Sequence, residues 1–241
     1  MSKILVVLSG GQDSTTCLAM AIQSHGVENV HAISFDYGQR HGIEITAARR
    51  IASLAGIASR HTVIFFGSGT LVGTSPLVDN SKAVEEYASA AVLPGGLEKT
   101  FVPMRNQLFL TVAANHAAAI ASDAGQELIQ VVTGLSQEDY GGYPDCRLPF
   151  LTSINKTIAL ALDDPGIPRV QVIAPLIGDS KRTTVMISED IPGARELLAH
   201  SHTCYNGRIP PCGTCHACLL RAKGYAEAGV TDPLLERLGG A

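Results

Sequence analysis

The sequence predicts an α/β fold in which helices sandwich a five-stranded parallel sheet, followed by a small C-terminal helical appendage. Three observations lead to this prediction. Short apolar runs alternate with stretches whose apolar residues recur at helical spacing, a pattern typical of a parallel sheet covered on both faces. The chain of 241 residues is 46% hydrophobic and 17% charged, a composition that supports a large core and argues against disorder. Four of its six cysteines lie within residues 204–218, which sets the C-terminal region apart.

The first part of the chain is expected to form three strands and two helices. Each predicted strand is a short apolar run, as expected of strands buried on both faces. Gly26 and Gly56 follow the two predicted helices and suit the backbone conformation with which helices commonly end. In order, the elements are a strand over Ile4–Leu8, a helix over Asp13–Gln23, a strand over Val30–Phe35, a helix in which Ile43, Ala47, Ile51 and Leu54 recur, and a strand over His61–Phe66.

Residues 67–100 lose this periodicity and are rich in glycine, serine and proline. Long connections in compact domains often form lids or binding loops, and one is expected here. Beyond it, right-handed crossovers are expected to add two more strands to the same sheet. The elements are a helix over Asn106–Ala124, a strand over Glu127–Thr133, a loop over Gly134–Arg147, a helix over Leu151–Leu162, a strand over Val170–Ala174 and, after more helix and the cysteine-rich loop, a helix near Leu219–Ala228.

The expected organisation is one α/β domain over residues 1–199 with an appendage packed on it over residues 200–241. No apolar run reaches the ~18 residues that span a bilayer, and the N-terminus lacks a signal-peptide pattern. The net charge of −4 and the absence of dense Lys/Arg runs argue against a nucleic-acid-binding surface. A cytoplasmic protein that binds small molecules, and neither nucleic acid nor membrane, is therefore predicted.

The first strand leads into Ser9-Gly-Gly-Gln-Asp-Ser-Thr15, which predicts a phosphate-binding loop. A strand, a glycine turn and a helix N-terminus aim unpaired backbone N–H groups and the positive end of the helix at one point. The hydroxyls of Ser9, Ser14 and Thr15 can donate hydrogen bonds to an anion there. The loop is not a Walker loop, because no Gly-Lys-Ser/Thr follows at the required spacing. An ordinary capped strand–turn–helix is the alternative interpretation.

The cysteine cluster follows the pattern Cys204-x7-Cys212-x2-Cys215-x2-Cys218. Four thiolates match the tetrahedral demand of one structural Zn²⁺, and each x2 pair allows chelation from one tight turn. A closed set of four cysteines leaves no open position for a substrate, so the predicted role is structural. Two disulfides, an iron–sulfur cluster or free thiols are the alternatives.

The glycine loop resembles that of the N-type ATP-pyrophosphatase (PP-loop) superfamily. Together with the cysteine cluster and the segments Ser34–His41, Phe101–Asn106 and Gly142–Arg147, it makes the chain similar to the 7-cyano-7-deazaguanine synthase family of queuosine biosynthesis from Lys3 to about Pro233. This resemblance implies a Rossmann-type fold of the adenine nucleotide alpha-hydrolase-like kind. It also implies ATP as co-substrate with Mg²⁺, one structural Zn²⁺ per chain, and a homodimer.

The resemblance further implies a carbon–nitrogen ligase. Family members adenylate the carboxylate of 7-carboxy-7-deazaguanine, add ammonia to form the amide, and adenylate the amide oxygen on the way to the nitrile. Because a carboxylate is a poor electrophile until its oxygen becomes a leaving group, the task of such an enzyme is to hold phosphates and position reactants. The resemblance assigns ATP binding to Leu8, Ser9, Gly10, Gly11, Gln12, Asp13, Ser14, Thr15, Thr16, Cys17 and Leu18.

Four residues are candidates for the chemical steps: Asp13 and Ser14 in the glycine loop, and the cations Arg105 and Lys181. The two cations are expected on loops after the third and fifth strands, near the carboxyl edge where open α/β sheets bind ligands, and suit an α-phosphate or a carboxylate. Solvated surface cations are the alternative. The candidates for binding the substrate base are Asp36, Tyr37, Asp145 and Arg147.

The chain departs from the family pattern at three positions. Met104 stands where glycine is usual, Ser136 where cysteine is usual, and Thr183 where glutamate is usual. These departures leave ATP use intact but leave open whether the product is the nitrile or the amide. Three competing functions are a tRNA-modifying PP-loop ATPase, a glutamine-dependent amidating enzyme and a zinc-stabilised nucleotide-binding regulator.

Overall fold

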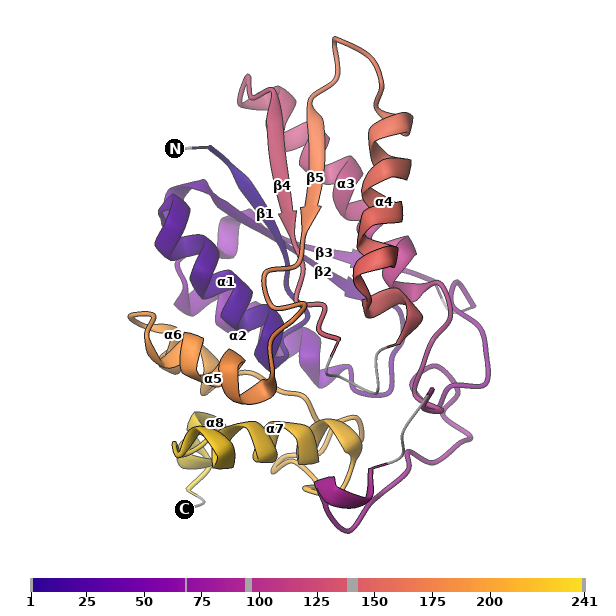
Figure 1. The fold of residues 1–241 in the computed structure, drawn as a ribbon, viewed down its shortest axis with the longest axis vertical. Coiled ribbons are helices and arrows are strands. Elements are labelled where there is room, and N and C mark those ends of the chain that lie inside the picture. Colours follow the sequence, from indigo (N-terminus) through magenta and orange to yellow (C-terminus); the bar gives the residue numbers. More distant parts are fainter. Residues whose placement is uncertain (1, 68, 94–96, 138–142, 240–241) are drawn as a thin grey trace.

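A computed structural model describes residues 2–67, 69–93, 97–137 and 143–239, so residue 68, residues 94–96 of the long connection and residues 138–142 of the predicted loop lie outside it. The predicted fold class is confirmed: five parallel strands form one sheet in the order β3-β2-β1-β4-β5, with helices on both faces (Figure 1). The strands are β1 (Ile4–Val7), β2 (Val30–Asp36), β3 (His61–Phe65), β4 (Leu128–Val132) and β5 (Arg169–Ile173).

The middle strand β1 pairs with β2 on one side and with β4 on the other, so that Ile4 lies opposite both Val30 and Gln130. The chain builds outward from β1 to β2 and β3, then returns to add β4 and β5 on the opposite side. The strand order therefore reverses between β1 and β4. In open α/β sheets this is the point at which the carboxyl ends of the strands leave a crevice for ligands.

The α-helices follow the alternation that the sequence predicts, and short 3-10 turns accompany them. Helices α1 and α2 cover one face of the sheet, and α3 and α4 cover the other (Figure 1). The α-helices are α1 (Gln12–His25), α2 (Ile43–Leu54), α3 (Arg105–Asp123), α4 (Leu148–Ala161), α5 (Lys181–Glu189), α6 (Ala194–Leu198), α7 (His216–Ala228) and α8 (Pro233–Arg237). The 3-10 turns in the described residues are Val27–Asn29, Ala58–Arg60, Ala90–Val92 and Pro144–Cys146.

The core consists of two aliphatic clusters separated by the sheet. Successive strand residues point to opposite faces, so Ile4 and Val6 pack against α1 and α2, whereas Leu5 packs against α3 and α4. In α3, Ala113 and Ala117 are fully buried, and small side chains of this kind let the helix lie close to the sheet. The packing agrees with a sequence rich in aliphatic residues and without tryptophan.

Two helices begin three residues earlier than predicted. Helix α4 starts at Leu148 rather than Leu151, because Pro149 is tolerated in a first turn whose N–H groups need no intrahelical partner. Helix α7 starts at His216 rather than Leu219, directly after Cys215, which is its N-cap residue.

The long connection before α3 packs on the C-terminal segment. The Tyr87 N–H donates to the Thr214 carbonyl over 2.8 Å, and Glu86 forms an antiparallel bridge with Cys215. Val84 is buried against the cysteine cluster. Residues 84–87 of this connection therefore pack on the cysteine-rich region, and the expected lid or binding loop stays a prediction.

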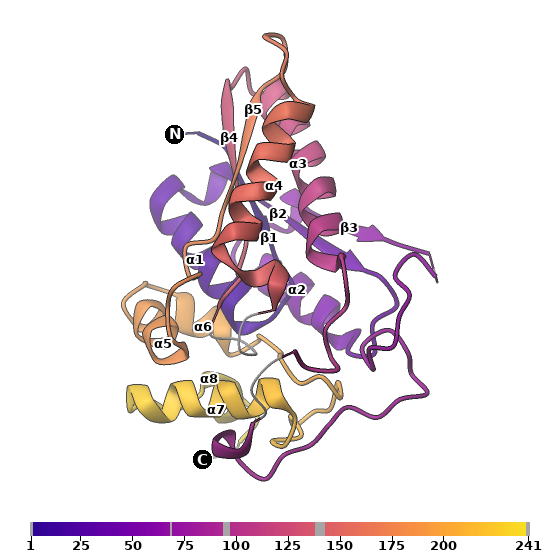
Figure 2. The ribbon, with the colours of Figure 1, turned by 45° about the vertical axis from the view of Figure 1, so that its right-hand side comes forward.

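The C-terminal helix α7 lies beside α5 at one end of the sheet, and α8 contacts α6 (Figures 1 and 2). The Arg221 Nε of α7 donates to the Asp232 carboxylate over 2.6 Å, and the same carboxylate caps α8. The division into residues 1–199 and 200–241 stays a prediction. Within the described chain, no helix combines the length and apolar character needed to cross a membrane.

A half-buried histidine, His61, gives the fold a pH dependence. The Nε2 of His61 lies 2.7 Å from the Ser34 hydroxyl, which donates to the Leu8 carbonyl, so neutral His61 can donate from Nε2. Burial, with a smaller effect of Arg49, lowers the pKa of His61 from 6.5 to about 4. Between these pH values the unfolded chain binds a proton at this position and the folded chain does not. We expect the free energy of unfolding to fall as pH decreases from 6.5 to 4.

Urea unfolding at pH 7 and pH 4.5 checks this expectation by comparing wild type with His61→Gln. The variant should lose less stability between the two pH values than wild type does, because the titrating group is gone. An equal loss in both proteins would contradict the assignment to His61.

Candidate active site

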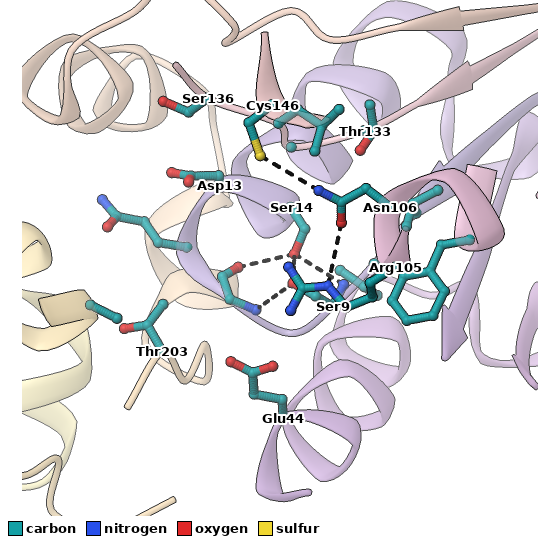
Figure 3. Close-up of a pocket in the computed structure, with 18 of the residues that line it drawn as sticks. Ser9, Asp13, Ser14, Glu44, Arg105, Asn106, Thr133, Ser136, Cys146 and Thr203 are labelled. Carbon is teal, nitrogen blue, oxygen red and sulfur yellow. Dashed lines mark hydrogen bonds between the residues drawn. The ribbon is translucent and has the colours of Figure 1, made fainter. Parts of the chain in front are cut away.

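A cavity of about 250 Å³ lies at the carboxyl ends of β1 and β4, where the strand order reverses. Its wall is formed by the loop between β1 and α1, the first residues of α3 and α5, the end of β4, and the segment around the cysteine cluster. Figure 3 shows side chains from these separate elements converging on one space. The position agrees with the general location of ligand sites in open α/β sheets.

The glycine loop at this cavity is held by its own hydroxyls. The Ser9 and Ser14 hydroxyl oxygens lie 2.9 Å apart, and the Ser9 N–H donates to the Ser14 hydroxyl over 3.2 Å (Figure 3). Gly10 has a φ of +89°, and a Cβ at this residue would lie 2.3 Å from the Glu44 carbonyl oxygen. Glycine is therefore required here, because α2 leaves no room for a side chain.

Only part of the predicted ATP-binding segment faces the cavity. Six residues line the wall: Leu8, Ser9, Gly11, Gln12, Asp13 and Ser14. The other five, Gly10, Thr15, Thr16, Cys17 and Leu18, are buried and lie outside the cavity lining. Cys17 is fully buried, and this burial raises the pKa of its thiol. The thiol lies 3.8 Å from the Thr133 carbonyl, so Cys17 packs between α1 and the end of β4.

An ion pair joins the start of α1 to the start of α5. The Lys181 Nζ lies 2.5 Å from the Asp13 Oδ2, and both side chains are nearly buried. Lys181 is the first residue of α5, not a loop residue as the sequence predicted, and its neighbour Arg182 is exposed. In the described structure Asp13 Oδ1 and Gln12 Nε2 are buried and lack a hydrogen-bond partner, so both are available to a ligand.

Arg105 is also a helix residue rather than a loop residue, since it begins α3. Its Nη1 donates to the Tyr37 hydroxyl over 3.5 Å. Burial opposes the guanidinium charge, but Tyr37 and the more distant Tyr205 and Asp145 outweigh this effect and raise the pKa of Arg105. Arg105 is therefore a fixed cation in the cavity wall.

The remaining substrate candidates have different fates. Tyr37 lines the cavity, and burial raises the pKa of its hydroxyl in spite of Arg105. Asp36, Asp145 and Arg147 lie outside the lining. Burial raises the pKa of Asp145, against the lowering effect of Arg105, while Arg147 is the exposed N-cap residue of α4.

Of the three departures from the family pattern, only Ser136 lines the cavity. Met104 is 60% exposed and precedes α3 with a φ of 64°, so the glycine usual there suits a left-handed backbone rather than a chemical role. Thr183 lies in the first turn of α5, where its N–H donates to the hydroxyl of the N-cap residue Ser180 and its own hydroxyl lies 2.9 Å from that hydroxyl. Ser136 is 3% exposed, and its hydroxyl has no hydrogen-bond partner in the described structure.

Three aromatic side chains, Phe35, Tyr37 and Phe109, form an apolar part of the cavity wall. The rings of Phe35 and Phe109 stack with centroids 4.4 Å apart and planes 12° apart, and Tyr37 packs against Phe109 at 5.4 Å. Flat aromatic surfaces of this kind suit a planar heterocycle.

Sequence reasoning missed a large part of the wall. Asn106 and His41 fall within segments that the sequence had set apart, and Asn106 Nδ2 lies 3.5 Å from the Cys146 sulfur (Figure 3). Thr203 and Tyr205 flank Cys204, which is the one local signal for them. Phe35, Gln39, Tyr143 and Cys146 also fall within segments that the sequence had set apart. The positions of the remaining missed residues depend on how distant helices and loops dock, and these residues are Val7, Glu44, Phe109, Thr133, Gly134, Leu135, Ala217, Leu220 and Arg221.

The four predicted metal ligands come together beside this wall. The sulfur atoms of Cys204, Cys212, Cys215 and Cys218 all lie within 4.8 Å of one another. Backbone N–H groups point at two of them: Cys212 N–H donates to the Cys204 sulfur over 3.4 Å, and Cys215 N–H donates to the Cys212 sulfur over 3.3 Å. Such donors stabilise thiolates, and four clustered thiolates fit one tetrahedral metal ion.

The fold and the site together define an open α/β protein with a parallel sheet, a ligand cavity at the reversal point of that sheet and a cysteine cluster next to the cavity. More specifically, the chain belongs to the family described as "Queuosine biosynthesis protein QueC", whose model matches residues 3–229. The resemblance that the sequence indicates is thereby confirmed.

Curated relatives agree with this membership. The 7-cyano-7-deazaguanine synthase of Chromobacterium violaceum is 49% identical over 98% of this chain and 94% of its own length. That of Laribacter hongkongensis is 48% identical over 98% of this chain and 95% of its own. A solved 4-thiouridine synthetase–RNA complex with bound ATP is 13% identical over 98% of this chain and 52% of that one, with a TM-score of 0.38, and this distant likeness carries no inference.

Proposed function

We propose that this chain is an ATP-dependent ligase that converts 7-carboxy-7-deazaguanine and ammonia to 7-cyano-7-deazaguanine. The name shared by the curated relatives supports the choice of substrate. The single observation that carries the proposal is the Lys181–Asp13 ion pair in the cavity wall beside the glycine loop, at the reversal point of the sheet. Such an arrangement combines an anion-binding helix N-terminus with a fixed cation for a phosphoryl group.

In the first half-reaction, a carboxylate oxygen of the substrate attacks the α-phosphorus of ATP, and pyrophosphate departs with the electron pair of the broken P–O bond. The N–H groups at the start of α1 and the hydroxyls of Ser9 and Ser14 would bind phosphate oxygens. Lys181 and Arg105 would balance the negative charge on the α-phosphate and the carboxylate. Ammonia then attacks the acyl carbon, AMP leaves with the C–O electron pair, and loss of a proton from nitrogen gives the amide.

In the second half-reaction, the amide oxygen attacks the α-phosphorus of another ATP, and pyrophosphate leaves again. The C–O bond to AMP breaks while the nitrogen loses its two protons, which produces the nitrile. The flat rings of Phe35 and Phe109 would hold the heterocycle in the same place through both steps. The complete reaction therefore releases two AMP per nitrile, whereas stopping at the amide releases one.

Two metal ions belong to the proposal. Zn²⁺ would be held by the four clustered cysteines, and its contribution is folding free energy. Mg²⁺ prefers oxygen ligands, and the unpartnered Oδ1 of Asp13 is the buried oxygen of the glycine loop that can contribute to holding the Mg²⁺ of ATP.

The experiment that tests the function is mass spectrometry of the products after incubation with 7-carboxy-7-deazaguanine, ATP and ammonium, together with AMP quantification. We expect the nitrile and a ratio of two AMP per product. Amide with one AMP per product would replace this function by the shorter reaction, and the absence of AMP would remove it. The shorter reaction is a second candidate because Ser136 lines the cavity where the family usually has cysteine.

Lys181 offers a sharper prediction about the chemical step. A cation fixed beside the departing AMP acts mainly in the transition state, so Lys181→Ala should lower kcat by roughly 10²–10³-fold with little change in the KM for ATP. Arg182→Ala is the matched control, because the neighbouring side chain is exposed. Steady-state AMP release from the two variants measures the difference. A crippled Arg182→Ala, or an effect on KM alone, would show that the role is assigned to the wrong residue.

Three expectations about assembly, partners and location stay predictions: the chain forms a homodimer, it does not bind nucleic acid, and it is cytoplasmic. Light scattering of the purified protein measures the oligomeric state. Gel retardation with tRNA at physiological salt separates the proposed ligase from a tRNA-modifying relative, since the ligase should not shift the tRNA.

A further inference from the structure

Helix α7 contains one glycine, Gly224, at a position where helices disfavour it. The residue lies in the interior of His216–Ala228, where alanine would form a more stable helix. Gly224 is buried, so the residue packs against other parts of the protein and does not face solvent. A glycine in such a position needs a packing reason.

The reason is the close approach of α7 to the first residue of α5. A Cβ on Gly224 would lie 2.8 Å from the Lys181 Cβ and 3.1 Å from both the Lys181 carbonyl carbon and oxygen. Two of these three atoms are backbone, so rotating a side chain cannot relieve the overlap. A methyl group here would have to separate the two helices.

Helix α7 is held in place by contacts at its N-terminus and in its middle. Its N-cap residue is Cys215, a member of the cysteine cluster. One turn before Gly224, the Arg221 guanidinium donates to both carboxylate oxygens of Asp232 over 2.6 and 2.8 Å, and to the Ser201 hydroxyl over 2.9 Å. Arg221 is 4% exposed, and a buried pair of this kind resists displacement.

We propose that Gly224 is a positioning residue that sets the place of Lys181 against Asp13. The Lys181 Nζ lies 2.5 Å from the Asp13 Oδ2, and a displacement of the first turn of α5 away from α7 would change this distance. Gly224 lies outside the lining of the cavity, and the three atoms nearest to a Cβ at this position all belong to Lys181. This inference rests on the proposed role of Lys181 in the adenylation steps.

The test compares Gly224→Ala with Ala222→Gly, a control at an exposed position two residues earlier in the same helix. Gly224→Ala improves the helix propensity of α7 and yet should lower kcat for AMP release, by roughly 10²-fold if Lys181 moves by about 1 Å. The KM for ATP should stay within about twofold, as for the loss of an interaction made in the transition state. Ala222→Gly should lower thermal stability but leave kcat unchanged.

Two further measurements separate positioning from a general structural effect. In the Lys181→Ala background, Gly224→Ala should cause no further loss of kcat, because its target is already absent. A crystal structure of Gly224→Ala should show Lys181 Nζ beyond about 3.5 Å from Asp13 Oδ2. This last readout needs no turnover, so it stands even if the proposed reaction fails.

Several results would overturn the proposal. These are a Gly224→Ala enzyme with wild-type kcat, a change in KM alone, additive losses in the double variant, or an unchanged ion pair in the crystal. A Gly224→Ala chain that does not fold would overturn it too, since the glycine would then serve the whole fold rather than Lys181.

Discussion

Replacing Asp13 by asparagine is expected to abolish AMP formation while leaving the chain folded. The carboxylate pairs with Lys181 over 2.5 Å and offers its second oxygen to the cavity. Asparagine keeps the shape but removes the charge, so the ion pair between Asp13 and Lys181 is lost and the glycine loop loses its carboxylate. Removing one fixed electrostatic group from an active site commonly lowers kcat by 10²–10³-fold. Asp13→Asn affects two such groups, Asp13 itself and Lys181, so we expect kcat to fall by roughly 10³-fold or more.

The control is Asp123→Asn, because Asp123 is the exposed last residue of α3 and does not line the cavity. Circular dichroism establishes that both variants are folded, and AMP release measures the reaction. Ser14→Ala, which removes the hydroxyl bonded to Ser9, should fall with Asp13→Asn and not with the control. An Asp13→Asn enzyme that retains full turnover would exclude the glycine loop from the chemistry.

The largest effect on stability is expected at the cysteine cluster. Ligation by four thiolates contributes folding free energy on the order of 10 kcal/mol in small zinc sites. Whole domains are commonly stable by about 5–15 kcal/mol, so Cys215→Ser should yield protein that is largely unfolded or insoluble. The effect should spread to the cavity, because Thr203 and Tyr205 on either side of Cys204 line it and Cys215 is the N-cap residue of α7.

Metal analysis of the wild-type protein should find about one zinc per chain, as four ligands around one ion require. Cys17→Ala is the matched control: this cysteine is buried outside the cluster, so its loss should cost about 1 kcal/mol and leave the zinc content unchanged. Chelation should lower the melting temperature of wild type. A metal-free chain that melts at the same temperature would contradict the zinc site.

Much of the molecule was accessible from local sequence. Each strand is a short apolar run, and each long helix places apolar residues at the spacing that covers a sheet, so the five-stranded parallel fold followed from periodicity alone. The glycine loop was equally local, because the turn, the helix start and the hydroxyls lie within seven residues. The requirement for glycine at Gly10 is tertiary, because it comes from the close approach of α2. The cysteine spacing likewise predicted a cluster whose four sulfur atoms do come together.

Tertiary structure decided what those local pieces build. Asp13 and Lys181 are 168 residues apart, and no spacing in the chain indicates that they pair. Arg105 and Lys181 begin helices rather than lying on loops, and Asp145 and Arg147 lie outside the cavity although their segment was a reasonable candidate. The residues in contact across a cavity depend on which face each helix buries and on what it meets there.

The C-terminal segment shows the difference most clearly. From the sequence it was a metal-binding appendage, defined by four cysteines whose ligand chemistry depends only on their own spacing. In the folded chain it supplies Thr203, Tyr205 and Arg221 to the cavity wall and brings Gly224 against Lys181. Local spacing determines which groups can bind a metal or an anion, because those groups lie on one turn. Packing between distant helices determines which of these groups line the same cavity. The way in which two helices dock depends on close packing over their whole interface, and no single residue specifies it.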